Sequence, residues 1–134
     1  MVFIIGEIGT NHAGSIKIAK KIIDAAVDAG FNAVKFQKKD IEQIYTKEFL
    51  DSYLESPWGT TQREMRLYRE FSDKQFQEID KYCKKKKIAC IDLAMKFDGK
   101  LEYWFDEIHT TVLCSKIIAN TVIDELVEII DNET

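Results

Sequence analysis

The stretch that decides the fold is "FIIGEIGTNHAGSIKIAKKIIDAAVDAGFNAVKFQ", residues 3–37. It begins with an apolar run, Phe3 to Ile8, that predicts a buried strand, and Asn32 to Gln37 predicts a second strand. Between them, apolar residues recur at helical spacing after Ser15, a typical capping residue, and Gly30 ends the helix. This order with short connections indicates two parallel strands joined by a right-handed crossover.

The rest of the chain repeats this alternation less clearly. Residues 38–71 predict a long excursion with short helical pieces, and the capping pair Ser72 and Gln75 predicts a helix from Asp73 to Lys86. Later segments predict strands over 88–94 and 111–118 and helices over 101–108 and 124–130. We therefore expect residues 1–134 to form one α/β domain with about four βα units of a parallel sheet, half of a (β/α)8 barrel.

Composition argues against several classes of partner. The net charge is −4, and the basic residues form no stripe with interleaved aromatics, which excludes nucleic acid as the expected ligand. The apolar run at the N-terminus contains Glu7 and is too short for a signal peptide or a membrane span. Three cysteines without a CxxC pair fit a reducing compartment, so we expect a cytoplasmic protein.

Polar side chains stand near the ends of the first two predicted strands. Working groups of parallel α/β sheets cluster at the carboxyl ends of the strands, where Glu7, Lys35 and Gln37 are placed. A buried lysine or glutamate is costly unless it is paired, solvated or bound to a charged ligand. We therefore predict an anion site in which Lys35 binds phosphate or carboxylate, Gln37 donates hydrogen bonds and Glu7 acts as a base or hydroxyl acceptor. A lysine that points outward to solvent is the alternative, and periodicity does not separate the two.

The two histidines, His12 and His109, do not form a metal motif. Neither has a second histidine or a carboxylate nearby at ligand spacing. The sequence therefore predicts no metal site within this chain.

Two blocks of the chain resemble the N-acetylneuraminate (sialic acid) synthase family: "FIIGEIGTNHAGSIKIAKKIIDAAVDAGFNAVKFQKKD", residues 3–40, and "SPWGTTQREMRLYREFSDKQFQEIDKYCKKKKI", residues 56–88. The resemblance implies a barrel enzyme that condenses phosphoenolpyruvate with an N-acetylated hexosamine, typically N-acetylmannosamine. Its products are phosphate and a nonulosonic acid, and sialic, legionaminic and pseudaminic acids all stay open. The family also uses a divalent metal, Mn²⁺ or Mg²⁺, to polarise the sugar aldehyde.

The same resemblance implies roles for single residues. Glu7 matches the family's catalytic glutamate, Lys35 its phosphoenolpyruvate-binding lysine and Gln37 a substrate-contacting glutamine. Asn11 matches a loop that lines the site, and Lys116 in "SKIIAN" resembles a second phosphate contact.

The resemblance weakens after Ile88. Residues 91–98, "IDLAMKFD", stand where the family has a Ser-Thr-Pro-Phe element. The family's metal-binding histidines and C-terminal antifreeze-like domain have no counterpart in the sequence, so we expect a truncated and inactive synthase half. The alternative is a non-catalytic half-barrel that self-associates as a homo-oligomer or binds a partner, because half a barrel exposes sheet edges.

Overall fold

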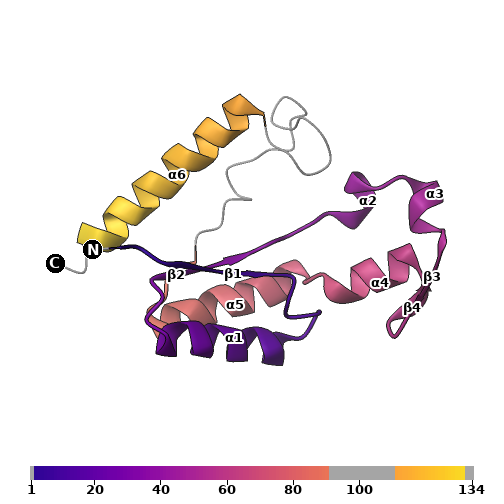
Figure 1. Cartoon of the computed structure of the whole chain (residues 1–134), viewed down its shortest axis with the longest axis horizontal. Coiled ribbons are helices and arrows are strands. Elements are labelled where there is room, and N and C mark those ends of the chain that lie inside the picture. Colours follow the sequence, from indigo (N-terminus) through magenta and orange to yellow (C-terminus); the bar gives the residue numbers. More distant parts are fainter. Residues whose placement is uncertain (1, 91–110, 132–134) are drawn as a thin grey trace. The chain divides into compact units, whose positions relative to one another are not determined.

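The structure is a computed structural model that describes residues 2–90 and 111–131. It divides into two compact units, Met1–Cys90 and Ile91–Thr134, which we describe separately. The elements, labelled in Figure 1, are β1 (Ile5–Gly9), α1 (Ile16–Asp28), β2 (Ala33–Phe36), α2 (Ile41–Ile44), α3 (Lys47–Leu50), β3 (Tyr53–Ser56), β4 (Gly59–Thr61), α4 (Gln62–Arg69), α5 (Asp73–Lys86) and α6 (Val112–Asp131). None of the helices in the described ranges is both long and apolar enough to cross a membrane.

The strand–helix–strand arrangement at the start of the chain is confirmed. β1 and β2 pair in parallel, with Glu7 opposite Lys35, and the register shifts between Glu7 and Gly9. At the other end of the pair, the backbone N–H of Ile4 donates to Asn32 Oδ1 at 2.9 Å. The two strands are therefore tied together where they begin, and their carboxyl ends carry the polar residues.

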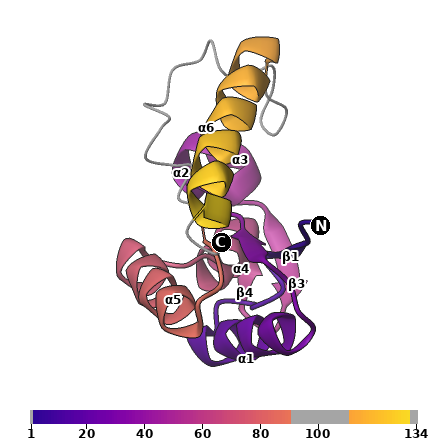
Figure 2. The ribbon, with the colours of Figure 1, turned by 90° about the vertical axis from the view of Figure 1, so that its left-hand side faces the viewer.

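The core of the first unit lies between this sheet and the helices α1 and α5. Both helices lie side by side on one face of the strands (Figures 1 and 2). The buried cluster between them includes Ile8, Ile23, Val34 and Ile79, each less than 5% exposed. Burying one such side chain stabilises the fold by about 1.5–3 kcal/mol. Val34 therefore packs under the helices, on the face of β2 opposite Lys35.

Local signals fix the ends of both core helices. Ser15 Oγ accepts a hydrogen bond from the Ile18 N–H at 3.3 Å and caps α1, and Gly30 follows the helix with a φ of 78°. The predicted capping box of α5 is present, because Ser72 and Gln75 each accept a hydrogen bond from the other's backbone. The predicted helix from Asp73 to Lys86 is confirmed with these bounds.

The excursion between β2 and α5 contains more structure than the sequence pattern predicts. Two short helices, α2 and α3, precede an antiparallel hairpin of β3 and β4, and α4 completes the segment. The turn of the hairpin depends on Ser56, whose Oγ accepts from the Trp58 N–H at 3.3 Å and donates to the Gly59 carbonyl at 2.9 Å. The hairpin strands are short, so they lack the alternation that identifies a strand.

The third predicted strand is only partly described. Ala89 forms an isolated parallel bridge with Ala33, whereas residues 91–94 of the predicted strand and the predicted helix over 101–108 lie outside the described residues. Within the described ranges, the parallel sheet therefore consists of two strands and this bridge. The chain is a mixed α/β protein with a short parallel sheet.

The second unit corrects the prediction for the end of the chain. The strand predicted over 111–118 is wrong, and one helix, α6, covers that segment and the separate helix predicted over 124–130. Thr111 Oγ1 caps it by accepting from the Cys114 N–H at 3.3 Å. The β-branched residues suggest a strand, but the less exposed positions recur at helical spacing: Cys114, Ile117, Ile118, Thr121 and Val122.

Candidate functional site

Glu7, in the middle of β1, and Lys35, near the carboxyl end of β2, contact each other. They are opposite each other in the register, and Lys35 Nζ donates to Glu7 Oε2 at 2.5 Å. The Lys35 and Glu7 side chains are 56% and 52% exposed. A pair so open to water contributes about 0–1 kcal/mol to stability. The two charges are therefore not needed to hold the fold and can engage a ligand from solvent.

Gly9 lets the backbone pass close to this pair. Its φ is 52°, and a Cβ built there would lie 3.2 Å from Glu7 Oε1 and 3.9 Å from Gln37 Oε1. Glu7 and Gln37 are thus both neighbours of Gly9. The structure brings three of the predicted site residues, Glu7, Lys35 and Gln37, to one edge of the sheet.

The loop after β1 holds Asn11 and His12 in different environments. Asn11 is exposed, whereas His12 is fully buried. The Nδ1 atom of His12 accepts from the Gly14 N–H at 3.1 Å, and its ring stacks on Phe71 with 3.8 Å between centroids. Burial, and next the nearby charge of Arg69, lower the pKa of His12, so the ring is neutral at pH 7. His12 therefore fixes the loop from within the protein.

Lys116, the remaining predicted site residue, lies in the second unit. It is exposed on α6, because the segment predicted as a strand is helical. The residue is therefore on a helix surface instead of in the predicted strand.

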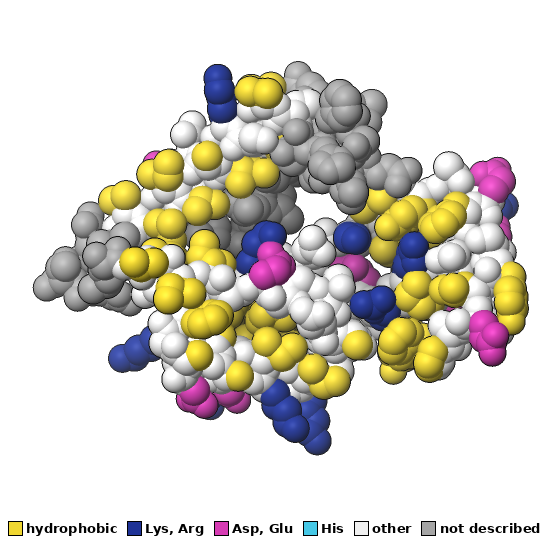
Figure 3. Space-filling model, in the orientation of Figure 1, with side chains coloured by type: hydrophobic (Ala, Val, Ile, Leu, Met, Phe, Trp, Pro, Cys, Tyr) yellow, Lys and Arg dark blue, Asp and Glu magenta, His cyan; other side chains and the backbone are white. Residues whose placement is uncertain are grey.

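A pocket that the sequence analysis missed opens directly beyond the two strands. It has a volume of about 210 Å³ and is lined by Thr10, Lys39, Ile41, Tyr45, Met65, Arg66, Arg69 and Glu70. Thr10 follows the last residue of β1, and Arg69 Nη2 donates to Thr10 Oγ1 at 3.5 Å. Figure 3 shows Lys and Arg side chains gathered among hydrophobic ones over this part of the molecule, where α2, α3 and α4 lie.

The pocket is built by packing α4 against the loop after β1. A Cβ on Gly14, whose φ is 76°, would lie 2.1 Å from the Tyr68 carbonyl oxygen, so only glycine permits this approach. A capping box starts α4, with Thr61 Oγ1 accepting from the Glu64 N–H at 3.2 Å and Glu64 Oε2 accepting from the Thr61 N–H at 3.2 Å. The sequence signal that could have indicated the pocket is the pair Arg66 and Arg69, three residues apart on α4.

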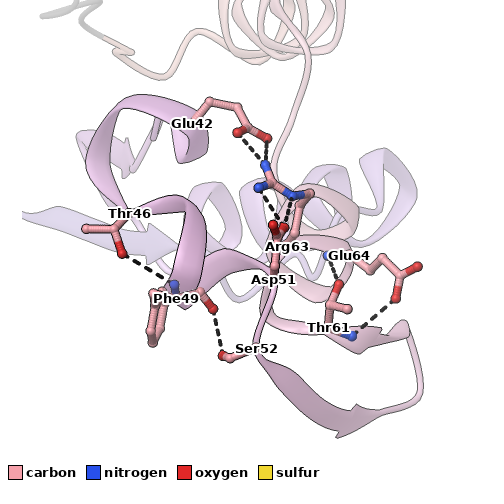
Figure 4. A network of polar contacts seen from close by, with 8 residues as sticks. All are labelled: Glu42, Thr46, Phe49, Asp51, Ser52, Thr61, Arg63 and Glu64. Carbon is pink, nitrogen blue, oxygen red and sulfur yellow. Dashed lines mark hydrogen bonds and ion pairs between the residues drawn. The ribbon is translucent and has the colours of Figure 1, made fainter.

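Arg63 anchors the start of α4 to the segments before it. Its guanidinium donates to the carboxylate of Glu42, in α2, and to Asp51 Oδ1 at 2.9 Å (Figure 4). The hydrogen bonds from Arg63 to Glu42, and next to Asp51, raise the pKa of Arg63. This network holds the three helices of the excursion together and so shapes the pocket.

The electrostatics of the pocket combine three cations with one carboxylate. Lys39, Arg66 and Arg69 line it together with Glu70, which accepts a hydrogen bond from the Lys39 backbone N–H at 3.2 Å. Burial raises the pKa of Glu70, against the smaller opposite effect of that N–H. The balance of charge in the pocket is positive.

A metal ion has no evident ligands in the described part of the chain. No three His, Cys, Asp or Glu side chains come together there in a way that could hold one. His12, in the loop after β1, is buried against Phe71 and neutral. The residues described here do not fit the divalent metal that the family resemblance implies, so we assign no step to it.

Comparison with known proteins identifies the relatives of this chain. The N-acetylneuraminate-9-phosphate synthase of Drosophila melanogaster is 44% identical over 85 residues, which cover 62% of this chain and 23% of that protein. The N,N'-diacetyllegionaminic acid synthase of Legionella pneumophila is 35% identical over 74 residues, which cover 53% of this chain and 21% of that protein. The chain thus spans less than a quarter of the length of these curated relatives.

A solved structure and a family model are also similar to this chain. The crystal structure of an N-acetylneuraminic acid synthetase from Leptospira borgpetersenii, in complex with citrate, is 32% identical. Its TM-score is 0.49, and the match covers 65% of this chain and 27% of that one. A sequence model of the NeuB family matches residues 22–113, more than half of the chain, including Lys35 and Gln37. The chain therefore belongs to the NeuB family.

Proposed function

We propose that the chain carries the phosphoenolpyruvate-binding residues of a nonulosonic acid synthase, whose acceptor is an N-acetylated hexosamine such as N-acetylmannosamine. The observation that carries the proposal is the direct pairing of Glu7 and Lys35 at the ends of two parallel strands, with Gln37 nearby. Membership of the NeuB family supports the reaction class. We further propose that β1 and β2 are the first two strands of a partial (β/α)8 barrel.

The chemistry of the pair suits an anionic substrate. The Lys35 ammonium is half exposed and bonded to one carboxylate oxygen, so an incoming carboxylate or phosphate replaces Glu7 as its partner at little cost. Gln37 offers amide donors and an acceptor for the same substrate. Glu7, released from Lys35, is then a free carboxylate next to the bound anion and acts as the base.

In the proposed reaction, C3 of phosphoenolpyruvate attacks the aldehyde carbon of the sugar. A carbon–carbon bond forms, and the aldehyde oxygen takes up a proton from solvent. Water adds its oxygen at C2 and gives one proton to Glu7, which returns it to solvent. The C2–O bond to phosphate then breaks, phosphate leaves with the bridging oxygen, and the remaining hydroxyl proton passes to the phosphate as the C2 carbonyl forms. In this scheme Lys35 neutralises the negative charge of the substrate throughout.

Calorimetric titration with phosphoenolpyruvate tests the role of Lys35. We expect Lys35→Ala to weaken binding at least tenfold, because a hydrogen bond to a charged group contributes about 1.5–3 kcal/mol. The matched control is Lys84→Ala, which removes another exposed ion pair, 2.7 Å from Asp80 on α5. Equal affinities for the wild type and Lys35→Ala, or an equal loss in both variants, would contradict the proposal.

Exposed hydrophobic residues near the start of β1 favour a second candidate function, a non-catalytic module that self-associates. Val2, Ile4 and Ile5 are 80%, 43% and 49% exposed, and Figure 3 shows further hydrophobic side chains open on the face in view. Burying them in an interface gains about 25 cal/mol per Å². Sedimentation velocity should then show dimers or larger species that Ile5→Lys dissociates, and a monomer at every concentration would refute this candidate.

A further inference from the structure

Three arginines stand three residues apart on α4, and their surroundings differ. Arg63 is paired with two carboxylates, those of Glu42 and Asp51. Arg66 and Arg69 form no ion pair within the described ranges, and the Nε atom of each is buried there without a hydrogen-bond partner. Buried donors without acceptors are costly, so native proteins seldom keep them without a use.

Aromatic rings hold both side chains in place without using their hydrogen-bonding edges. The guanidinium of Arg66 lies over Tyr45 and Phe49, 4.7 and 5.0 Å from the ring centroids. That of Arg69 lies over Trp58 at 5.6 Å, and its hydrogen bonds go to the Met65 sulfur at 3.9 Å and to Thr10. Stacking engages the face of a guanidinium and leaves its N–H donors, which lie in the plane, for an oxyanion.

We propose that the pocket lined by Thr10, Lys39, Arg66 and Arg69 is a second anion site, separate from Lys35, which binds a phosphate group. The expected ligand group is a tetrahedral dianion, which a phosphate monoester and free orthophosphate both provide. Arg66 and Arg69 supply paired N–H donors, which match phosphate oxygens in geometry. Thr10 Oγ1 and Lys39 complete the lining on the side of the strands.

The charge of the pocket suits this ligand. Three positive side chains and one negative side chain leave a net charge of +2, and a phosphate monoester carries about −1.5 to −2 at pH 7. Glu70 opposes the anion, but its carboxylate is engaged by the Lys39 backbone N–H. Glu70→Gln retains an acceptor for that N–H and removes the charge, so it should tighten phosphate binding.

Amide NMR spectra recorded during titration with orthophosphate, in about 0.15 M salt to screen non-specific attraction, test the site. We expect the amides of Thr10, Lys39 and Arg69 to shift, and Arg66→Gln or Arg69→Gln to weaken binding at least tenfold. Lys81→Gln, which removes one exposed charge from α5, is the matched control and should bind as the wild type does. Unchanged affinity in the arginine variants, or shifts confined to Lys84–Lys87, would overturn the proposal.

A conservative variant keeps the test valid if a glutamine variant does not fold. Arg69→Lys retains the charge and loses the planar donors, so binding should weaken at least threefold while thermal unfolding stays close to that of the wild type. An Arg69→Lys protein that is folded and binds phosphate unchanged refutes the site. Lys35→Ala should leave orthophosphate binding in the arginine-lined pocket intact. The test of this pocket is therefore independent of the test of the proposed function.

Sugar ligands then distinguish the source of the phosphate. N-acetylmannosamine 6-phosphate that binds more tightly than orthophosphate identifies a phosphate monoester as the occupant. Equal binding of the two identifies free phosphate, which also supports the site. If unphosphorylated N-acetylmannosamine binds as tightly as its 6-phosphate, the pocket does not recognise phosphate and the proposal is wrong.

Discussion

At the end of β1, Gly9 combines a left-handed backbone with close contact to Glu7. Its φ is 52°, and an added Cβ would lie 3.2 Å from Glu7 Oε1. We expect Gly9→Ala to destabilise the fold by about 1–2 kcal/mol through backbone strain and to weaken phosphoenolpyruvate binding by displacing Glu7. Urea unfolding and calorimetric titration measure the two effects.

Gly30 provides the control for this substitution. Its φ is 78°, and a Cβ there would meet no atom within 4 Å. Gly30→Ala should therefore cost a similar free energy of unfolding and leave ligand affinity unchanged. If the two variants lose affinity equally, the contact between Gly9 and Glu7 does not position the site.

His12 makes stability depend on pH. Burial and Arg69 lower the pKa of His12 in the folded state, whereas the unfolded chain keeps the ordinary value of about 6.5. Below that value the unfolded state binds more protons, so protonation favours unfolding. The contribution of neutral His12 is therefore complete above the unfolded pKa and decreases as the pH falls from there toward the folded pKa.

His12→Phe should flatten this pH dependence. Phenylalanine can keep the stacking on Phe71, and it cannot be protonated or accept from the Gly14 N–H, which costs about 1 kcal/mol at every pH. Urea unfolding of both proteins between about pH 5 and about pH 8 gives the difference in slope. The raised pKa of Glu70 makes stability fall as the pH rises, which is opposite to the effect of His12. Only the difference in slope between the two proteins therefore reports on His12. Identical slopes would contradict the assignment of this pH dependence to His12.

At the scale of elements, two capping boxes of the same kind allow a matched comparison. Thr61 begins α4, which carries the arginines of the pocket, and Ser72 begins α5, which packs in the core. Thr61→Ala and Ser72→Ala should each lower the free energy of unfolding by about 1 kcal/mol. Only Thr61→Ala should also weaken orthophosphate binding, measured by NMR titration. Equal weakening in both variants would show that the pocket responds to global stability alone.

The elements that the sequence predicts well are those with local signals at both ends. The capping residues Ser15 and Ser72, together with helical apolar spacing, define α1 and α5, and short segments rich in apolar residues define the two parallel strands. The hairpin of β3 and β4 has few residues and no alternation to detect. α6 was missed because its β-branched residues suggest a strand, although their spacing is helical.

The residues of the candidate site likewise include some that the sequence predicts and others that it does not. Glu7, Lys35 and Gln37 could be placed together because strand order and alternation fix where a side chain lies in a parallel sheet. The arginine pocket could not be predicted, because Thr10, Lys39 and Arg69 come from three segments that only tertiary packing unites. Lys116 lies in a segment that the sequence predicts as a strand, and because this segment is helical, strand order and alternation do not place the residue.

At the scale of the whole molecule, groups of positive side chains lie in a protein whose net charge is negative. The net charge is −4, yet Lys35 lies near the carboxyl end of β2, and three cations line the pocket that includes Thr10, the residue after β1. A second basic group, Lys84–Lys87, ends α5, where it favours the helix dipole and needs no ligand. A substrate anion that binds at the strand ends and not at Lys84–Lys87 recognises a built site. An anion that binds both regions alike is held by general attraction to positive charge.

The most direct measurement is an amide NMR titration of the wild-type chain with phosphoenolpyruvate, in about 0.15 M salt. We expect the largest shifts at Glu7, Lys35 and Gln37, and we expect Lys35→Ala to abolish them. Shifts spread over Lys84–Lys87 and other exposed lysines, with no preference for the ends of β1 and β2, would contradict the claim that these strand ends bind the substrate.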